Sequence, residues 1–426
     1  MTVLVIAVFV VVYVLIATER VHRVTAALAG AGVMLLLQVV DAEDAFHSVE
    51  TGIDWEVIFL LLGMMLVVSV LRRTGLFEYL AIWSAKRARG RPYRILVILC
   101  LVTAVASALL DNVTTVLLIA PVTVLIAERL GTSPVPYLIA QVLASNIGGT
   151  GTLVGDPPNI IIGSRAGLSY VDFLINLGPV VLVVLVLFLL LARLLFRSDL
   201  TAHPDRVSEV MELEEREAIE DPGLLIRSAV VLGAVTVGFL LHSVLHYDPS
   251  VVALLGAGVL LAISRLDFGE LARDVEWETL VFFAGLFIMV GALVEVGVIE
   301  DIARLAADAT EGRPLLATMS ILVVSAVLSG VVDNIPYVAA IVPVVAGLSA
   351  SLGSGDVLWW ALALGAGLGG NATAVGASAN VVVVGIAGKS GYPIRFAHFL
   401  KYGVLVTAVS VAVSAAYLWL RYFVFA

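Results

Sequence analysis

Long apolar runs, such as Trp55–Leu71 and Phe173–Phe196, follow one another along the whole of this 426-residue chain, which is 61% hydrophobic. Backbone groups inside a lipid bilayer must find their hydrogen bonds within the protein, so only helices and closed barrels cross it. A crossing helix takes roughly 20 apolar residues. The runs therefore predict an all-α polytopic membrane protein with about ten transmembrane spans, placed as a multi-pass protein in the lipid bilayer of the cell (inner) membrane.

An internal repeat divides the runs into two halves. Residue types recur 222 or 221 positions later, too often in one register to be chance. The matching pairs include Trp55–Glu56 with Trp277–Glu278 (277 − 55 = 222), Asp111–Asn112 with Asp333–Asn334 (333 − 111 = 222), Thr152 with Thr373 and Asn159 with Asn380 (380 − 159 = 221). The chain is therefore predicted to be a duplication.

Each half is expected to contain five crossings, one re-entrant hairpin and one broken helix. Because five is odd, the second half would be inverted relative to the first. The first inverted repeat takes residues 1–196, with a hairpin at 93–130 and a broken helix at 136–165. The second takes residues 223–426, with a hairpin at 315–352 and a broken helix at 356–389. An acidic linker, 197–222, joins them.

The basic residues predict the orientation. If both termini lie outside, only four of the 24 Lys and Arg fall outside, namely Arg165, Arg304, Arg313 and Arg421. This distribution obeys the positive-inside rule and places the linker 197–222 in the cytoplasm. Most of the net charge of −10 is gathered in that linker, so the acidity is local and no nucleic-acid partner is expected.

The stretch Ser145–Asn159 interrupts an apolar run with glycines, two prolines and several polar side chains. Irregular backbone at membrane depth persists only where it is buried in protein or lines a cavity. An acid there, such as Asp156, marks a candidate functional site. A weaker echo, Gly367–Asn380, occupies the matching place in the second half. Two interrupted spans at corresponding places are typical of a transporter's binding site.

Two hairpin tips and two interrupted spans thus form the predicted site. Helix ends that meet there offer N–H groups to an anion and carbonyl oxygens to a hard cation such as Na⁺. Low dielectric also favours a neutral carboxyl, so each Asp could instead carry a proton. Na⁺ is expected at Asp111, Asn112, Asp333 and Asn334, and Na⁺ or H⁺ is the expected coupling ion, without any other cofactor. The full set of predicted ligands is Asp111, Asn112, Thr114, Thr115, Asn146, Gly149, Thr150, Thr152, Gly155, Asp156, Asn159, Asp333, Asn334, Gly370, Asn371, Thr373, Ser378 and Asn380.

Structural interpretations of the same acids stay open at this point. Asp111 and Asp333 could simply cap helices. Asp156, whose counterpart in the repeat is Ala377, could shape an Asx–Pro turn. Cys100 is the only cysteine, so a soft-metal site is not expected, and the sequence contains no nucleotide-binding loop, serine elbow or HExxH motif. The chain is therefore not expected to be an enzyme.

Four segments resemble the ion transporter superfamily, namely DNVTTVLLIAPVT, SNIGGTGTLVGDPPNIII, DNIPYVAAIVPV and LGGNATAVGASANVVVVGIA. They look like the P-protein group and the permeases grouped with ArsB arsenite carriers and NhaD sodium/proton antiporters, and more distantly like sodium-coupled dicarboxylate carriers. The resemblance implies a scaffold that forms a homodimer and a transport domain that moves as an elevator. It places ion and substrate ligands at Asn112, Thr114 and Asn334, and matches Thr152, Asn159, Thr373 and Asn380 to the paired loops.

One departure bears on the substrate. Asp111 and Asp333 stand where the dicarboxylate carriers have serine, and Asp156 adds a third acid. Close carboxylates repel a dicarboxylate unless bound cations or protons neutralise them. We therefore expect a secondary active transporter that moves arsenite or another small inorganic anion coupled to Na⁺ or H⁺. The alternatives are a Na⁺/H⁺ antiporter and a passive anion channel of the same fold.

Overall fold

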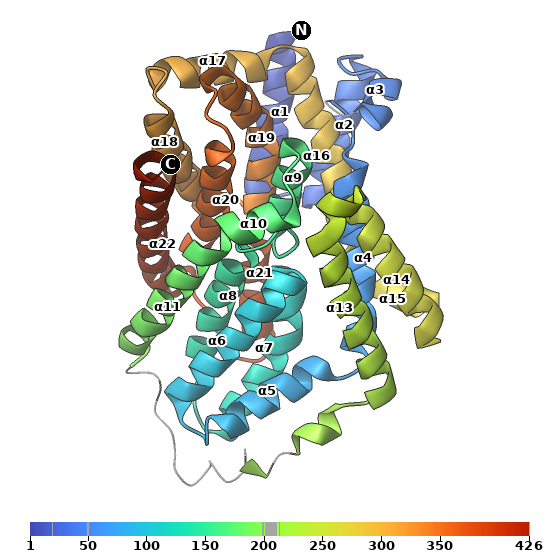
Figure 1. Cartoon of the computed structure of the whole chain (residues 1–426), viewed down its shortest axis with the longest axis vertical. Coiled ribbons are helices and arrows are strands. Elements are labelled where there is room, and N and C mark those ends of the chain that lie inside the picture. The colour runs from blue at the N-terminus through green and yellow to red at the C-terminus, as the bar shows by residue number, and fades with distance from the viewer. Residues whose placement is uncertain (19, 49–50, 198–199, 201–210, 213, 426) are drawn as a thin grey trace.

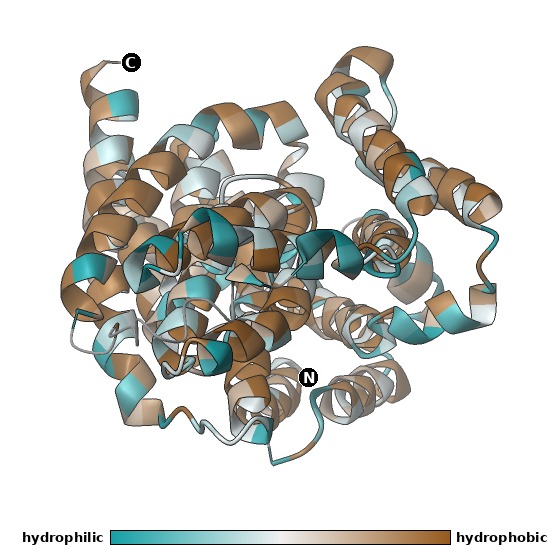
Figure 2. Cartoon of the chain, turned by 90° about the horizontal axis from the view of Figure 1, so that it is seen from below, coloured by the Kyte–Doolittle hydropathy of each residue, from teal (hydrophilic) through white to brown (hydrophobic). Residues whose placement is uncertain are grey.

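The computed structural model describes residues 1–18, 20–48, 51–197, 200, 211–212 and 214–425, and every regular element within them is a helix (Figure 1). This confirms the predicted all-α class. Nine of these helices are long and apolar enough to cross a membrane by length and composition. Their outward faces carry large hydrophobic side chains, such as Leu194 (71% exposed) and Val230 (65%). Figure 2 shows hydrophobic residues along most of the long helices and hydrophilic residues gathered on short helices and connections.

The two halves present nearly the same order of helices. The first half contains α1 (Thr2–Ala17), α2 (Arg23–Leu36), α3 (Ala42–His47), α4 (Trp55–Arg72), α5 (Leu76–Arg87), α6 (Pro92–Leu109), α7 (Asn112–Arg129), α8 (Val135–Gly149), α9 (Pro157–Ala166), α10 (Tyr170–Asn176) and α11 (Gly178–Leu195). The second contains α13 (Pro222–Leu245), α14 (Pro249–Ser264), α15 (Phe268–Asp274), α16 (Trp277–Glu295), α17 (Val298–Ala309), α18 (Pro314–Val331), α19 (Asn334–Leu352), α20 (Val357–Gly369), α21 (Ser378–Lys389) and α22 (Phe396–Trp419). Short segments η2 (Glu215–Ala218), η3 (Gly370–Ala372) and η4 (Leu420–Val424) complete the described elements. The inverted orientation of the halves remains a prediction.

The sequence explains where many helices begin. Proline occupies the first turn of α6, α8, α9, α11, α13, α14 and α18, where its missing N–H costs no helical hydrogen bond. Aspartate side chains cap the N-termini of several others, as Asp54 does for α4 by accepting from the Val57 N–H at 3.2 Å. Gly75 and Gly297 precede α5 and α17 with φ of 75° and 76°, a conformation that favours glycine.

Helices from the two halves interlace in what we call the scaffold group, α1, α2, α4, α13, α14 and α16. Helix α4 packs on α14 of the other half, and α2 packs on α16. Small residues allow this close approach. A Cβ at Gly63 would lie 2.8 Å from the Ala253 backbone, and one at Gly285 would lie 3.0 Å from the Ala27 backbone. The scaffold group is therefore held together by close helix contacts between the two halves.

A second group, which we call the site group, contains α6–α9 and α18–α21. Helix α6 packs on α8 and α18 packs on α20, while α7 contacts α21 and α9 contacts α19 across the halves. The interrupted spans are thus enclosed by hairpin helices of both halves. The amphipathic helices α5 and α17 lie against α7 and α19 respectively.

Gly148 gives a first testable prediction for this packing. A Cβ there would lie 2.2 Å from the Ala104 carbonyl oxygen on α6, so Gly148→Ala must push α6 and α8 apart. We expect a loss of about 1–3 kcal/mol, the usual cost of overpacking, seen as a lower melting temperature in detergent. Gly32→Ala is the matched control, because nothing lies within 4 Å of its added Cβ. Equal melting temperatures for the two variants would contradict the packing.

The predicted linker 197–222 lies partly outside the described residues, but its C-terminal end is docked on α5. Lys86 forms an ion pair with Glu215, and the Glu220 N–H donates to the Thr74 carbonyl at 3.1 Å. The hydrogen bond from Lys86 holds the pKa of the Glu215 carboxyl below its usual range. The linker end is thereby fastened beside the first hairpin, since α5 also contacts α7.

This contact predicts a pH dependence with a definite sign. A carboxyl whose pKa is lowered by docking stabilises the docked state fully at any pH above its ordinary pKa of about 4.3. This contribution is lost as the pH falls through the lowered pKa. The protection of amides 214–220, which is their exchange rate compared with that of an unstructured peptide at the same pH, should therefore be high at neutral pH and fall below about pH 4. In Glu215→Gln, the protection should be lower at neutral pH and should lose this acid step.

Candidate functional site

The hairpin tips are two points where one helix ends and the next begins after an aspartate. Asp111 accepts from the Thr114 N–H at 2.8 Å and caps α7. Asp333 accepts from the Ile335 N–H at 3.0 Å and caps α19. Both predicted ligands therefore have a structural role as helix caps. Each cap uses one carboxylate oxygen, so the other oxygen can accept a further hydrogen bond or bind a cation.

The interrupted spans bring backbone against backbone at paired glycines. A Cβ at Gly149 would lie 2.4 Å from the Gly155 carbonyl oxygen, and one at Gly370 would lie 2.9 Å from the Gly376 carbonyl oxygen. Glycine is needed at these positions because the chain crosses itself at van der Waals distance. The predicted glycine ligands Gly149, Gly155 and Gly370 thus shape the loops.

In each half, a threonine and an asparagine that recur in the repeat hold the interrupted span against its hairpin. Thr152 Oγ1 donates to the Ala108 carbonyl at 2.6 Å, and Thr373 Oγ1 donates to the Gly330 carbonyl at 2.7 Å. Asn159 and Asn380 each donate, at 2.8 Å, to the carbonyl of the threonine in their own half. The hydrogen bonds match across the halves, and they position backbone rather than leave these side chains facing an open cavity.

Asp156 lies where the two hairpin tips meet. Its Oδ1 accepts from Asn112 Nδ2 at 3.2 Å, and its Oδ2 accepts from Asn334 Nδ2 at 3.1 Å. The side chain is 1% exposed and, although it precedes α9, it makes no capping hydrogen bond there. In the part of the chain that the structure describes, no Lys, Arg or His forms an ion pair with it. One buried carboxylate is thus shared by the amides of both halves.

A chain of buried amides continues from this carboxylate. Asn112 Nδ2 also donates to Asn146 Oδ1 at 3.2 Å. Asn146 Nδ2 in turn donates to Asn371 Oδ1 and Asn380 Oδ1, both at 2.9 Å. Each of these asparagines is at most 2% exposed. The network therefore links both tips and both interrupted spans in one rigid unit.

The remaining predicted residues lie around this unit. Thr150 Oγ1 donates to the Asn146 carbonyl, and the Thr114 N–H donates to the capping carboxylate of Asp111. Among the described residues, Asn112 Oδ1 and Thr115 Oγ1 are buried atoms without a hydrogen-bond partner. Unpaired buried oxygens beside a carboxylate suit a desolvated hard cation. Within the described chain no group of three or more His, Cys, Asp and Glu could hold a metal ion, so amide and hydroxyl oxygens would have to complete such a site.

Arg23 is a site neighbour that the sequence reasoning missed. It begins α2 of the scaffold group and donates from Nη1 to Ser378 Oγ at 3.1 Å. Ser378 Oγ donates in turn to Asp333 Oδ2 at 2.5 Å. The repeat gave no signal, because the position 222 residues later is Leu245. A basic side chain from outside the four predicted elements therefore reaches one of their acids.

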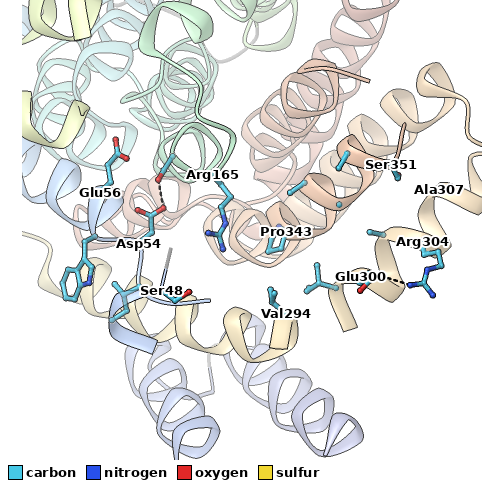
Figure 3. Close-up of a pocket in the computed structure, with 18 of the residues that line it drawn as sticks. Ser48, Asp54, Glu56, Arg165, Val294, Glu300, Arg304, Ala307, Pro343 and Ser351 are labelled. Atoms are coloured by element: carbon cyan, nitrogen blue, oxygen red, sulfur yellow. Dashed lines mark hydrogen bonds and ion pairs between the residues drawn. The ribbon is translucent and has the colours of Figure 1, made fainter. Parts of the chain in front are cut away.

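A cavity of about 1190 Å³ lies between α4, α9, α17 and α19, at the boundary of the scaffold and site groups. Figure 3 shows Arg165 of α9 between Asp54 and Pro343, with Arg304 and Glu300 of α17 at the far end. Ser164 Oγ donates to Asp54 Oδ2 at 2.6 Å across the boundary. The cavity is lined by both signs of charge and by an apolar wall of α17 and α19.

Sequence comparisons identify the family of this chain. The sequence profile described as citrate transporter matches residues 13–365, most of the chain. The chain belongs to the citrate transporter family. It is therefore a multi-pass membrane transporter of the secondary type and not an enzyme.

Full-length relatives agree with membership of the citrate transporter family. An uncharacterized transporter of Mycobacterium tuberculosis is 57% identical over 428 residues, covering all of both chains. A 46 kDa membrane protein of Mycobacterium leprae is 56% identical over 427 residues, again covering all of both. The human P protein is 35% identical over 489 residues, covering 96% of this chain and 58% of its own length. The resemblance to the P-protein group is thereby confirmed.

Two solved structures share the fold of this citrate transporter family member. The YdaH transporter of Alcanivorax borkumensis has a TM-score of 0.63 at 14% identity and covers 94% of this chain and 97% of its own. MtrF of Neisseria gonorrhoeae, described within a class of antimetabolite efflux pumps, has a TM-score of 0.63 at 13% identity, with 92% and 84% covered. At such identities the likeness concerns the fold alone.

Proposed function

We propose that this transporter moves arsenite or another small inorganic anion, coupled to Na⁺ or H⁺, by an elevator movement of the site group against the scaffold group. The observation that carries the proposal is Asp156, a buried carboxylate whose hydrogen-bond partners among the described residues are the amides of both hairpin tips. Such a carboxylate has a strong tendency to take up a cation or a proton, because neutral amides do not balance its charge. Its occupancy would therefore be coupled to the position of both tips.

The charges near the site support a small or neutral substrate. Asp111, Asp156 and Asp333 contribute three carboxylates, and Arg23 reaches this cluster only indirectly, through the Ser378 hydroxyl that donates to Asp333, among the described residues. Citrate, which the family description names, would meet like charges unless bound cations neutralised them. Helix N-termini at α7, α9, α19 and α21 still offer N–H groups to a small anion.

A Na⁺/H⁺ antiporter is the second candidate. It is favoured by the same carboxylate, since two competing cations can exchange at one acid without any anion. The cavity beside Arg165 supports an anion instead, because it gives a negative substrate a basic side chain at the boundary of the two groups.

One proteoliposome panel tests these candidates. Arsenite, antimonite, chloride, citrate and succinate are offered one at a time, under an imposed Na⁺ or H⁺ gradient or none. Accumulation of arsenite or another inorganic anion above equilibrium, only with a gradient, is the expected result. Na⁺-driven proton movement without any anion would identify the antiporter. Uptake that equilibrates but never accumulates would identify a passive channel, and accumulation of citrate alone would overturn the proposed substrate class.

We also propose a homodimer held through the scaffold group, in the cell (inner) membrane, with both termini outside and the linker 197–222 in the cytoplasm. Exposed apolar side chains on α13 and α14, such as Val230 and Leu255, support a scaffold surface that can pack in lipid or against a second copy. Labelling of a cysteine placed at Asp308 by an impermeant reagent added to whole cells should succeed, and one placed at Glu215 should react only after permeabilisation. The reverse result would overturn the orientation.

A further inference from the structure

Arg23 forms a polar contact between the scaffold group and α21 of the site group. Its Nη1 donates to Ser378 Oγ at 3.1 Å and its Nη2 donates to Thr279 Oγ1 at 3.4 Å. Its guanidinium also lies 5.6 Å from the ring centroid of Phe282, which is buried. The first contact joins the scaffold to the site group, and the other two fix the side chain within the scaffold.

Ser378 connects Arg23 to Asp333 of the predicted binding site by a second hydrogen bond. Its hydroxyl donates to Asp333 Oδ2 while the other carboxylate oxygen, Oδ1, caps α19. A hydroxyl that accepts from a guanidinium becomes a stronger donor, so the chain Arg23–Ser378–Asp333 is strongest when Asp333 is ionised. A cation or proton at Asp333 would remove the charge that this chain balances.

We propose that Arg23 is a charge-controlled latch, which holds the second hairpin and α21 on the scaffold while Asp333 is ionised and lets them go when Asp333 binds a cation or proton. This inference rests on the proposed function in one respect, that Asp333 changes its occupancy during transport. Arg23 is a positioning residue, because it acts through Ser378 and Asp333 rather than on the substrate.

Other charged and titratable groups lie near this chain and must be held constant in a test. Tyr13 of α1 and Asp156 before α9 interact with Asp333, and Glu276 before α16 interacts with Arg23 and with Asp111 at the first tip. Tyr337 of α19 interacts with Tyr13. Glu276 accepts from Thr279 Oγ1 at 3.1 Å, so it lies on the far side of the Arg23 contact. None of these groups is a second cation that could replace Arg23.

A distance measurement tests the latch without any substrate. In a Cys100→Ala background, spin labels are placed at Leu36, 84% exposed on α2, and at Lys389, exposed at the end of α21. Wild type without Na⁺ should give one narrow distance distribution. Arg23→Gln should shift or broaden it, Asp333→Asn should produce the same change, and the double variant should add nothing further. Arg23→Lys should largely restore the wild-type distribution.

Two outcomes would overturn the latch: an unchanged distance in Arg23→Gln, or changes that add in the double variant. Melting temperature and size-exclusion profile check that each variant is folded. Transport gives an independent readout, in which Arg23→Gln should lower gradient-driven uptake by about tenfold or more. If uptake in wild type proves not to depend on any gradient, the proposed function fails, whereas the distance result still decides the latch.

Discussion

Asp156→Asn should reduce gradient-driven transport to background, a loss of about 100-fold or more. Asp156 is the one acceptor that the amides of Asn112 and Asn334 share. An asparagine there presents one NH₂ group to a partner that is itself a donor, so one tip loses its hydrogen bond. It also lacks the charge that a coupling cation or proton would meet. The variant should still insert in the membrane, because Asp156 caps no helix.

The measurement is uptake into proteoliposomes with and without an imposed Na⁺ or H⁺ gradient. Asp308→Asn, which removes an exposed acid on α17, is the matched control and should transport like wild type. Asp156→Asn should also lose the gradient dependence of any residual flux. Full gradient-driven accumulation by this variant would show that the shared carboxylate has no role in coupling.

Asp111→Asn and Asp333→Asn should each abolish coupled transport while leaving stability almost unchanged. The structure makes this separation testable, because each aspartate caps a helix through one carboxylate oxygen. Asparagine caps a helix about as well as aspartate, so the cap is kept while the charge is lost, and at Asp333 the oxygen that accepts from Ser378 is lost with it. Alanine at the same positions removes the cap as well and should cost about 0.5–2 kcal/mol.

The comparison of Asn and Ala variants therefore separates two roles in one experiment. Melting temperature in detergent reports the cap, and uptake in proteoliposomes reports the charge. If Asp333→Asn transports normally while Asp333→Ala is unstable, capping is the whole function of that residue. If both variants melt as wild type does, the capping hydrogen bond contributes nothing.

The duplication in the sequence was informative about the helix breaks. Asp111–Asn112 and Asp333–Asn334 do fall between consecutive helices, and the glycine-rich stretches do interrupt α8–α9 and α20–α21. These features could be read locally, because glycine, proline and aspartate act on the backbone within a few residues. The nine long apolar helices of the described chain could also be predicted locally, because each is a long, predominantly apolar run of residues.

Residues without a counterpart in the repeat could not be ranked in this way. Asp156 pairs with Ala377, so the repeat does not distinguish a binding role for it from an Asx–Pro turn. In the structure, the repeated threonines and asparagines make the same backbone contacts in both halves. Asp156 lies between the halves and binds both tips, so one copy of it is enough. Arg23 was missed because its contact with Ser378 joins residues 355 positions apart, which no local pattern reveals.

The pairing of Asp156 with Ala377 has a consequence for the electrical work of transport. Two duplicated halves would ordinarily suggest two equivalent ion sites, yet among the described residues one carboxylate, Asp156, meets both tips. A single acid takes one proton or one monovalent cation, so under the proposed coupling this position would contribute one elementary charge to each cycle, before the charge of the substrate is counted. Across 100 mV such a charge supplies about 2.3 kcal/mol, which sets roughly a 50-fold limit on the accumulation it can drive alone.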